Sequence, residues 1–145
     1  MTHCSLSGNL PHDLMEMGPL ESLDLSFNLF SGEIPVEWSA RHLVGSSSLK
    51  HLDLSHNRLE GTRISEWTKQ ASLTQINLSH NSFSGPLPVE LFGRPYRLQK
   101  LWLNNNFFTG NFGLVSRMGS LEVLDVSSNN LVGPVPMRIL FSPGL

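Results

Sequence analysis

The chain has 145 residues, of which 39% are hydrophobic and 15% charged, and its formal net charge is -2. This composition suits one folded domain and excludes a disordered chain, which would be poor in large aliphatic residues and rich in charge. The small negative charge excludes a basic surface for nucleic acid, and no apolar run approaches the roughly 20 residues that span a bilayer. Cys4 is the sole cysteine, so the fold is not held by internal disulfides.

One pattern recurs along the chain, namely Leu-x-x-Leu-x-Leu-x-x-Asn followed by an apolar residue and a glycine. The partial repeat 1–19 carries only the second half of the pattern, with Cys4 at the Asn position. Five full repeats follow at 20–48, 49–72, 73–97, 98–120 and 121–145. Repeated self-similarity of this kind predicts one solenoid domain over 1–145, because each unit buries its apolar face against its neighbours.

Within each repeat the apolar positions alternate, which predicts a short strand with one buried face. In the first full repeat, Leu23 and Leu25 are expected to point inward and Asp24 outward. Stacked repeats would place these strands side by side in a parallel sheet, about 4.8 Å apart. The connecting pieces are too short for long helices, so 3-10 or single-turn segments are expected on the opposite side.

An asparagine follows each predicted strand. A carboxamide both donates and accepts hydrogen bonds, so it can satisfy backbone groups of its own turn and of the adjacent repeat. We therefore expect a buried structural ladder of Asn28, Asn57, Asn81, Asn106 and Asn129.

The repeats resemble the plant-type subclass of the leucine-rich repeat family, in which a Phe/Leu-x-Gly-x-Ile/Leu-Pro half follows the Asn. The resemblance covers nearly the whole chain. It implies an α/β solenoid: a right-handed curved array with a parallel concave β-sheet of about five to six short strands and short 3-10 or turn segments on the convex side. The subclass is known from ectodomains of plant receptor kinases and receptor-like proteins.

Some repeats depart from this pattern. About five extra residues in 40–48 predict a convex bulge, since insertions in repeat arrays map to loops on one face. Arg63-Ile64 and Phe112-Gly113 replace the Ile-Pro pair in the second and fourth full repeats. Neither end carries the polar capping segment such arrays need, so we expect further repeats or caps in a longer parent protein, or a truncated gene product.

Side chains between the strand leucines are expected to line the concave face, where leucine-rich repeat proteins commonly bind partners. One column, which includes Asp24 and Asp53, lies between the two strand leucines, and a second column, which includes Ser26, Ser55 and Ser79, follows it. Both columns belong to the repeat consensus and are expected to face outward. The departures from consensus carry more information, and an exposed Trp beside polar groups is typical of an interface anchor. The candidate partner-binding residues are Phe27, His51, Asp53, His56, His80, Lys100 and Trp102.

His56 and His80 occupy the same column in adjacent repeats, with Asp53 nearby. Three interpretations stay open: a divalent metal site, a pH-sensitive pair of imidazoles, and ordinary solvated histidines. A stable metal site needs three or four ligands and a fixed second shell of hydrogen bonds, so we assign no metal and no cofactor.

Asn77-Leu78-Ser79 is an N-glycosylation sequon, although the repeat consensus also generates it. A glycan on Asn77 would cover the middle of the concave face. Motifs of hydrolases, zinc proteases, redox dithiols and P-loops are absent, and Cys4 has no oriented base, so the chain is not expected to be an enzyme.

The sequence favours a recognition module that binds a protein or peptide through its concave face, as a fragment of a cell-surface receptor or receptor-like protein. It would act outside the cell or at its surface as part of a larger protein, without inserting into the membrane. Two alternatives stay open. Pro35-Val-Glu-Trp38-Ser and Ile64-Ser-Glu-Trp67-Thr are similar to a stretch of trypanosomatid surface antigens, which suggests a protist adhesion array. The missing signal peptide and lone cysteine suggest a cytoplasmic scaffold.

Overall fold

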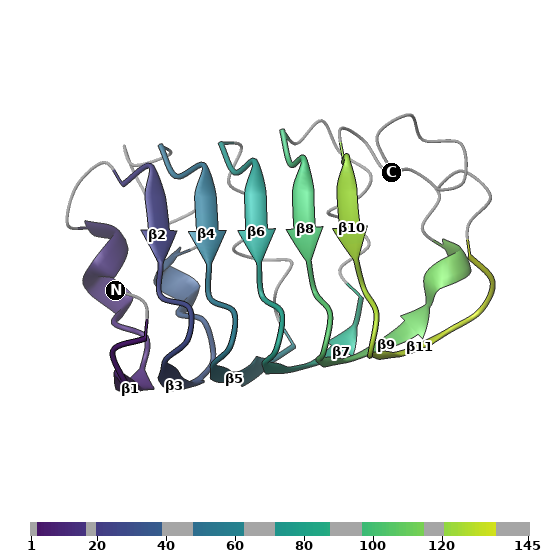
Figure 1. Cartoon of the computed structure of the whole chain (residues 1–145), viewed down its shortest axis with the longest axis horizontal. Coiled ribbons are helices and arrows are strands. Elements are labelled where there is room, and N and C mark those ends of the chain that lie inside the picture. The colour runs from purple at the N-terminus through teal and green to yellow at the C-terminus, as the bar shows by residue number, and fades with distance from the viewer. Residues whose placement is uncertain are drawn as a thin grey trace.

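The computed structural model describes residues 3–16, 20–38, 48–62, 72–87, 97–114 and 121–135. Within these ranges, short strands and 3-10 segments (η) follow one another from repeat to repeat (Figure 1). In chain order they are β1 (Ser7–Asn9), η1 (His12–Glu16), β2 (Ser22–Asp24), β3 (Leu29–Gly32), η2 (Val36–Trp38), β4 (His51–Asp53), β5 (Arg58–Gly61), β6 (Gln75–Asn77), β7 (Ser82–Pro86), β8 (Lys100–Trp102), β9 (Phe107–Asn111), η3 (Phe112–Leu114), β10 (Val123–Asp125) and β11 (Asn130–Val132).

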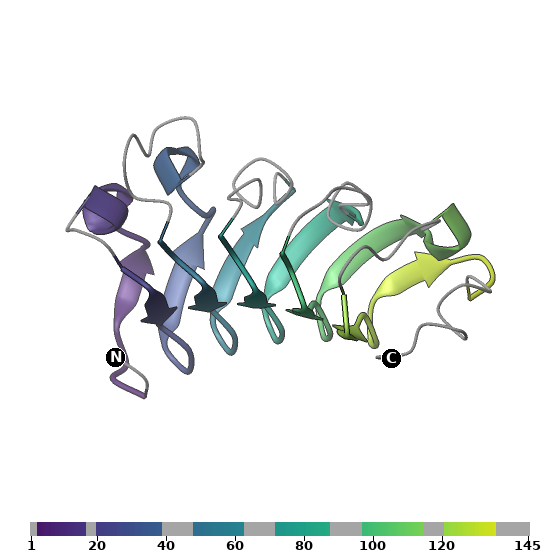
Figure 2. The ribbon, with the colours of Figure 1, turned by 90° about the horizontal axis from the view of Figure 1, so that it is seen from above.

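The first sheet is the predicted one. Strands β2, β4, β6, β8 and β10 pair in parallel, in that order, and each comes from one full repeat (Figure 1). The register aligns equivalent residues, so that Leu52 lies between Leu23 and Ile76, and Leu101 between Ile76 and Leu124. The array curves with these strands along its inner side, which confirms the solenoid with a concave parallel sheet (Figure 2).

A second parallel sheet was not predicted. It contains β1, β3, β5, β7, β9 and β11, formed by the residues after each Asn-column position. Neighbouring strands are shifted by two residues, so the buried apolar residue of one repeat pairs with the glycine of the previous one, as Phe30 does with Gly8 and Leu59 with Gly32. The apolar-x-Gly stretch is too short to show an alternation, which is why sequence periodicity does not reveal this sheet.

Glycine is required where the second sheet turns. Gly32 and Gly85 have φ of 76° and 84°, in the left-handed region that residues with a Cβ rarely adopt. A Cβ on Gly85 would also lie 3.0 Å from Cβ of Thr62 in the preceding repeat. Close stacking of the repeats therefore depends on the missing side chain.

The core lies inside the coil, and the repeat leucines Leu54, Leu78, Leu101 and Leu103 are completely buried. Trp38 in η2 is also buried, and its Nε1 donates to the carbonyl oxygen of Pro11 at 3.1 Å. Burial of this kind stabilises by about 25 cal/mol per Å² of apolar surface. A continuous core through all the repeats follows from their stacking.

The Asn column provides a hydrogen-bonded ladder beside this core. Asn81 Nδ2 donates to the carbonyl oxygens of Leu78 and Ser79 in its own repeat and of Leu54 in the previous one, at 2.9–3.2 Å. Its Oδ1 accepts the N–H of Leu59 at 3.0 Å. Three other ladder asparagines make the same pattern of bonds; they are Asn57, Asn106 and Asn129. Asn28 donates to two carbonyl oxygens of its own repeat, and its Oδ1 accepts the N–H groups of Cys4 and Leu6 in the partial repeat.

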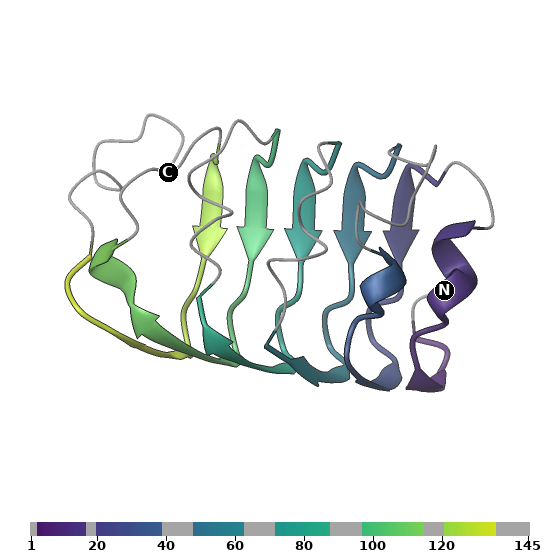
Figure 3. The same cartoon turned by 180° about the vertical axis from the view of Figure 1, so that it is seen from behind.

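The segments η1 and η2 lie on the side of the coil opposite the concave sheet, where 3-10 turns were predicted (Figure 3). The expected bulge at 40–48 falls outside the described residues except for Ser48, and Arg63-Ile64 also falls outside them. Phe112-Gly113, the departure in the fourth repeat, forms η3. No helix in the described part of the chain is long and apolar enough to cross a membrane.

Candidate functional site on the concave face

Two columns of side chains run across the concave sheet, as the sequence predicted. The pairing aligns Asp24, Asp53, Asn77, Trp102 and Asp125 in one column. The other column consists of Ser22, His51, Gln75, Lys100 and Val123.

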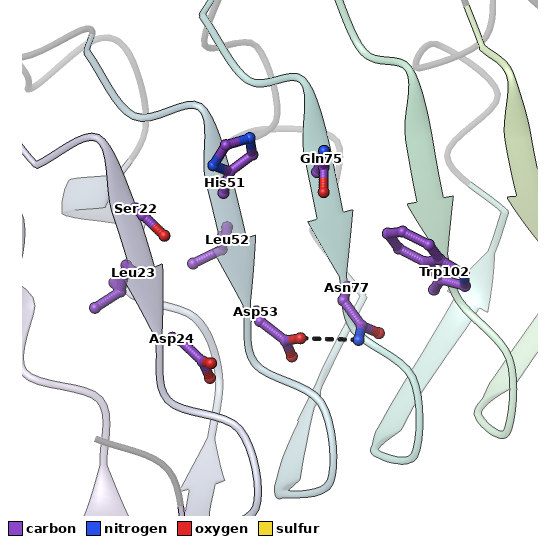
Figure 4. A pocket seen from close by; sticks show the side chains of 9 residues that line it. All are labelled: Ser22, Leu23, Asp24, His51, Leu52, Asp53, Gln75, Asn77 and Trp102. Atoms are coloured by element: carbon purple, nitrogen blue, oxygen red, sulfur yellow. Dashed lines mark hydrogen bonds between the residues drawn. The ribbon is translucent and has the colours of Figure 1, made fainter.

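A hollow of about 220 Å³ lies between these columns over β2, β4, β6 and β8 (Figure 4). Its lining residues are Ser22, Leu23, Asp24, His51, Leu52, Asp53, Gln75, Asn77 and Trp102. Three of the predicted partner-binding residues, His51, Asp53 and Trp102, are therefore brought together.

The carboxylates of the first column are held by serines two residues later. Asp24 Oδ1 accepts the N–H of Ser26 at 3.0 Å and its hydroxyl at 2.7 Å. Asp53 Oδ1 binds Ser55 in the same way, at 2.9 and 2.6 Å. The sequence interpretation placed the Ser column on the outward face, which is wrong for Ser26, Ser55 and Ser79. These serines are only 2–6% exposed, because their hydroxyls turn back to cap the preceding column.

Asn77 takes part in the same arrangement without a charge. Its Oδ1 accepts the N–H and hydroxyl of Ser79 at 3.1 and 2.8 Å, and its Nδ2 donates to Asp53 Oδ2 at 3.0 Å (Figure 4). Trp102 and Lys100 on β8 are half-buried, whereas His51 on β4 is exposed. The middle of the face is thus preorganised by bonds within the column.

Phe27, His56 and His80, which the sequence interpretation put on the concave face, lie beyond the ends of the concave strands. Each sits three residues after a concave strand, in a left-handed turn with φ of 53–55°. Their rings stack from repeat to repeat at centroid distances of 4.0 and 4.1 Å, and His3 extends the stack by 4.3 Å. The turns therefore form a ring ladder (His3, Phe27, His56, His80) beyond the ends of the concave strands.

Position in the ladder affects the charge of His56. Its burial lowers the pKa of the imidazole from the ordinary value of 6.5, and the neighbouring His80 and His3 lower it further, whereas the Asp53 carboxylate acts in the opposite direction. The His80 ring contacts Asn105 of the next repeat at 3.3 Å. The ladder thus favours the uncharged form of His56.

The ladder does not have the geometry of a metal site. The rings of His56 and His80 are inclined by only 12°, so the lone pairs of their nitrogens run side by side. Two imidazoles that bind one zinc ion must converge on a point about 2.0–2.1 Å from both nitrogens. The described residues also contain no group of three or more His, Cys, Asp or Glu side chains that could hold a metal ion.

Sequence reasoning missed two features of this region. It discounted Asp24 as consensus and did not select Gln75, yet both line the hollow. It also did not place His3 in the ladder, although His3 precedes Cys4 as Phe27 precedes Asn28. Alignment of the partial repeat would have found that signal.

Comparison with known proteins agrees with this geometry. The Leucine Rich Repeat family profile matches residues 19–40, 48–69, 72–93 and 120–140, more than half of the chain. The chain belongs to the leucine-rich repeat family. Receptor-like protein 7 of Arabidopsis thaliana is 35% identical to it over 135 residues, which cover 92% of this chain and 13% of that protein. The chain thus spans a small part of the curated relatives it matches.

Solved structures with this fold include plant receptors. The Arabidopsis receptor kinase HAESA, in complex with the peptide hormone IDA and the co-receptor SERK1, superposes with a TM-score of 0.80 and 28% identity, covering 100% of this leucine-rich repeat chain and 24% of that one. A TDR receptor superposes with a TM-score of 0.79 and 41% identity, covering 93% of this chain and 22% of that one. The fold is thus one that plant receptors use for protein interaction.

Proposed function

We propose that this leucine-rich repeat chain is a recognition segment of a plant-type receptor-like protein, and that it binds a peptide or another ectodomain through its concave face. The observation that carries the proposal is the hollow on the five-stranded sheet, with Trp102 at one end and fixed polar groups beside it. Because the Asp and Asn side chains are already held by serines and by one another, little ordering entropy is lost on binding.

Trp102 is the residue most suited to anchor such a partner. Its indole is half-buried on β8, where it lines the hollow beside Asn77. Large aromatic side chains in partly enclosed positions dominate binding energy at interfaces. The exposed His51 and the half-buried Lys100 supply polar contacts on the other column. The ring ladder lies at the border of this surface, where Phe27 is 43% exposed.

The proposal extends to location and to the parent protein. The relatives named above are receptor-like proteins, of which this chain spans a small part, and this supports an extracellular array with further repeats. Asn77 lines the hollow, so peptide binding there requires that its sequon carries no glycan.

Selection of ligands tests the proposal directly. The purified chain is used to select binders from a displayed library of extended peptides, in parallel with a Trp102→Ala variant. The proposal expects wild-type binders that lose affinity for the variant. A control variant, Glu60→Gln, changes an exposed residue of β5 in the second sheet and should bind as the wild type does. Binders that ignore Trp102→Ala but lose affinity for Glu60→Gln would refute concave-face recognition.

A further inference from the structure

We infer that the ring ladder is a pH-sensitive switch at the border of the concave face: its rings stack while His56 and His80 are uncharged, and they separate when both carry a proton. The inference goes beyond the proposed function, because it concerns the chain by itself and needs no ligand. The switch would change the edge that a partner meets, from a closed stack of rings to separate cationic side chains along the turns.

The stack brings two titratable rings into direct contact. The ring centroids of His56 and His80 lie 4.1 Å apart with an interplanar angle of 12°, and Phe27 stacks on the other face of His56 at 4.0 Å. Two positive charges at this separation repel one another, so two close imidazoles take up their protons in separate steps. The second proton places both charges within the stack and therefore favours the open form.

The surroundings of His56 oppose its protonation in the stack. The titratable groups that act on it are Asp53 in its own repeat, His80 in the next one and His3 at the end of the ring ladder. Burial and the two other histidines lower the pKa of His56, whereas the Asp53 carboxylate raises it. A proton thus binds more weakly to the stacked His56 than to a solvated imidazole, and by linkage it favours a form in which the stack is open.

A second contact depends on the charge of His80. Asn105, in the next repeat, places its Nδ2 3.3 Å from Nε2 of His80. An amide nitrogen only donates, so this ring nitrogen accepts, and the proton of the uncharged imidazole is on Nδ1. Protonation of Nε2 removes the acceptor, and a bond forms again only if the carboxamide turns its oxygen toward the ring. In the repeat of His80, the neutral Asn77 also stands where Asp53 stands in the repeat of His56.

The backbone of these turns is held independently of the rings. The N–H of His56 donates to the carbonyl oxygen of Ser79, and the N–H of His80 donates to that of Asn104, both at 3.0 Å. These bonds join neighbouring repeats, and the side chain of His80 is exposed. The ring ladder can therefore open by rotation of side chains at the surface while the repeats stay stacked.

A pH titration of the isotope-labelled chain, followed by nuclear magnetic resonance from about pH 8 to about pH 4.5, tests the inference. The ring signals of His56 and His80 should change in two steps that are separated by about one pH unit or more. Nuclear Overhauser contacts between the rings of Phe27 and His56 should be lost in the second step. The methyl signals of Leu54 and Leu78, which are completely buried, should stay unchanged throughout.

Matched variants separate the charge from the ring. His80→Phe keeps an aromatic ring at this position, as Phe27 does in the first full repeat, but removes one of the two charges. In this variant His56 should titrate in a single step, and its contact with Phe27 should persist. His12→Gln removes an exposed histidine of η1, outside the ring ladder, and should leave both steps unchanged. Circular dichroism shows whether each variant is folded.

One-step titration of both imidazoles in the wild type, or ring contacts that persist to the acidic end of the titration, would overturn the switch. So would a loss of the ring contacts together with the core methyl signals, because it marks acid unfolding. An unchanged two-step loss of contacts in His80→Phe would also overturn it. The proposed function is tested separately, through peptide binders that depend on Trp102, and it stands or falls independently of these results.

Discussion

Replacing Asn81 by alanine should destabilise the fold through one particular hydrogen bond. The three carbonyl oxygens that Asn81 Nδ2 reaches keep a second donor, because Leu54 O also accepts from Asn57, Leu78 O from Asn106, and Ser79 O from the N–H of His56. The N–H of Leu59 instead relies on Asn81 Oδ1, in a repeat whose Leu59 side chain is completely buried.

An unsatisfied buried donor costs about 1–3 kcal/mol, so Asn81→Ala should lower the free energy of unfolding by about 2 kcal/mol. Urea denaturation followed by circular dichroism measures this change. Asn130→Ala, at an exposed position of β11, is the control and should change stability by less than about 0.5 kcal/mol. If Asn81→Ala is no more destabilising than Asn130→Ala, the ladder bond to Leu59 contributes nothing and the reasoning fails.

Four further outcomes are expected. Trp102→Ala should weaken the binding of a selected peptide by about 2 kcal/mol in calorimetry with an unchanged melting temperature; equal affinity would remove Trp102 as an anchor. Since the fold lowers the pKa of His56, the unfolded chain binds its proton more readily, and the free energy of unfolding should fall as pH decreases through the ordinary value of 6.5. His56→Phe should reduce that pH dependence in urea titrations, whereas an identical dependence would contradict the assignment. Gly85→Ala combines backbone strain with a close contact and should destabilise the fold by about 1–2 kcal/mol. Gly8→Ala is the control and should destabilise less, because Gly8 has φ of 92° but open space where a Cβ would lie. Equal thermal melts of the two variants would exclude a role for the contact. A secreted form of the chain should keep its mass on treatment with an N-glycan-removing enzyme, because a glycan on Asn77 would occupy the hollow; a loss of mass that Asn77→Gln abolishes would refute peptide binding there.

The local pattern was sufficient to predict the concave half of the fold. Leu-x-x-Leu-x-Leu places alternate apolar residues on one face of a strand, and its recurrence requires stacking to bury them, so β4 and β6 and their register follow from the sequence. The role of the Asn column likewise follows from the chemistry of a carboxamide, which can donate and accept at once. These features are periodic and act within one repeat or between neighbours, which is why the sequence alone determines them.

Tertiary structure decided the rest, because it depends on backbone conformation that the pattern does not encode. The left-handed turn at His56 moves its ring off the concave strand and into a stack with Phe27, which counting along the chain did not anticipate. The same turn region buries Ser55, whose hydroxyl donates to Asp53 Oδ1. This bond fixes the carboxylate of Asp53, which faces the hollow. Whether a polar residue after a strand faces solvent or caps its neighbour depends on that local geometry. The backbone conformation of the folded repeats therefore determines which side chains a partner can reach. The spacing of the repeat residues in the sequence is sufficient to determine the solenoid that carries them.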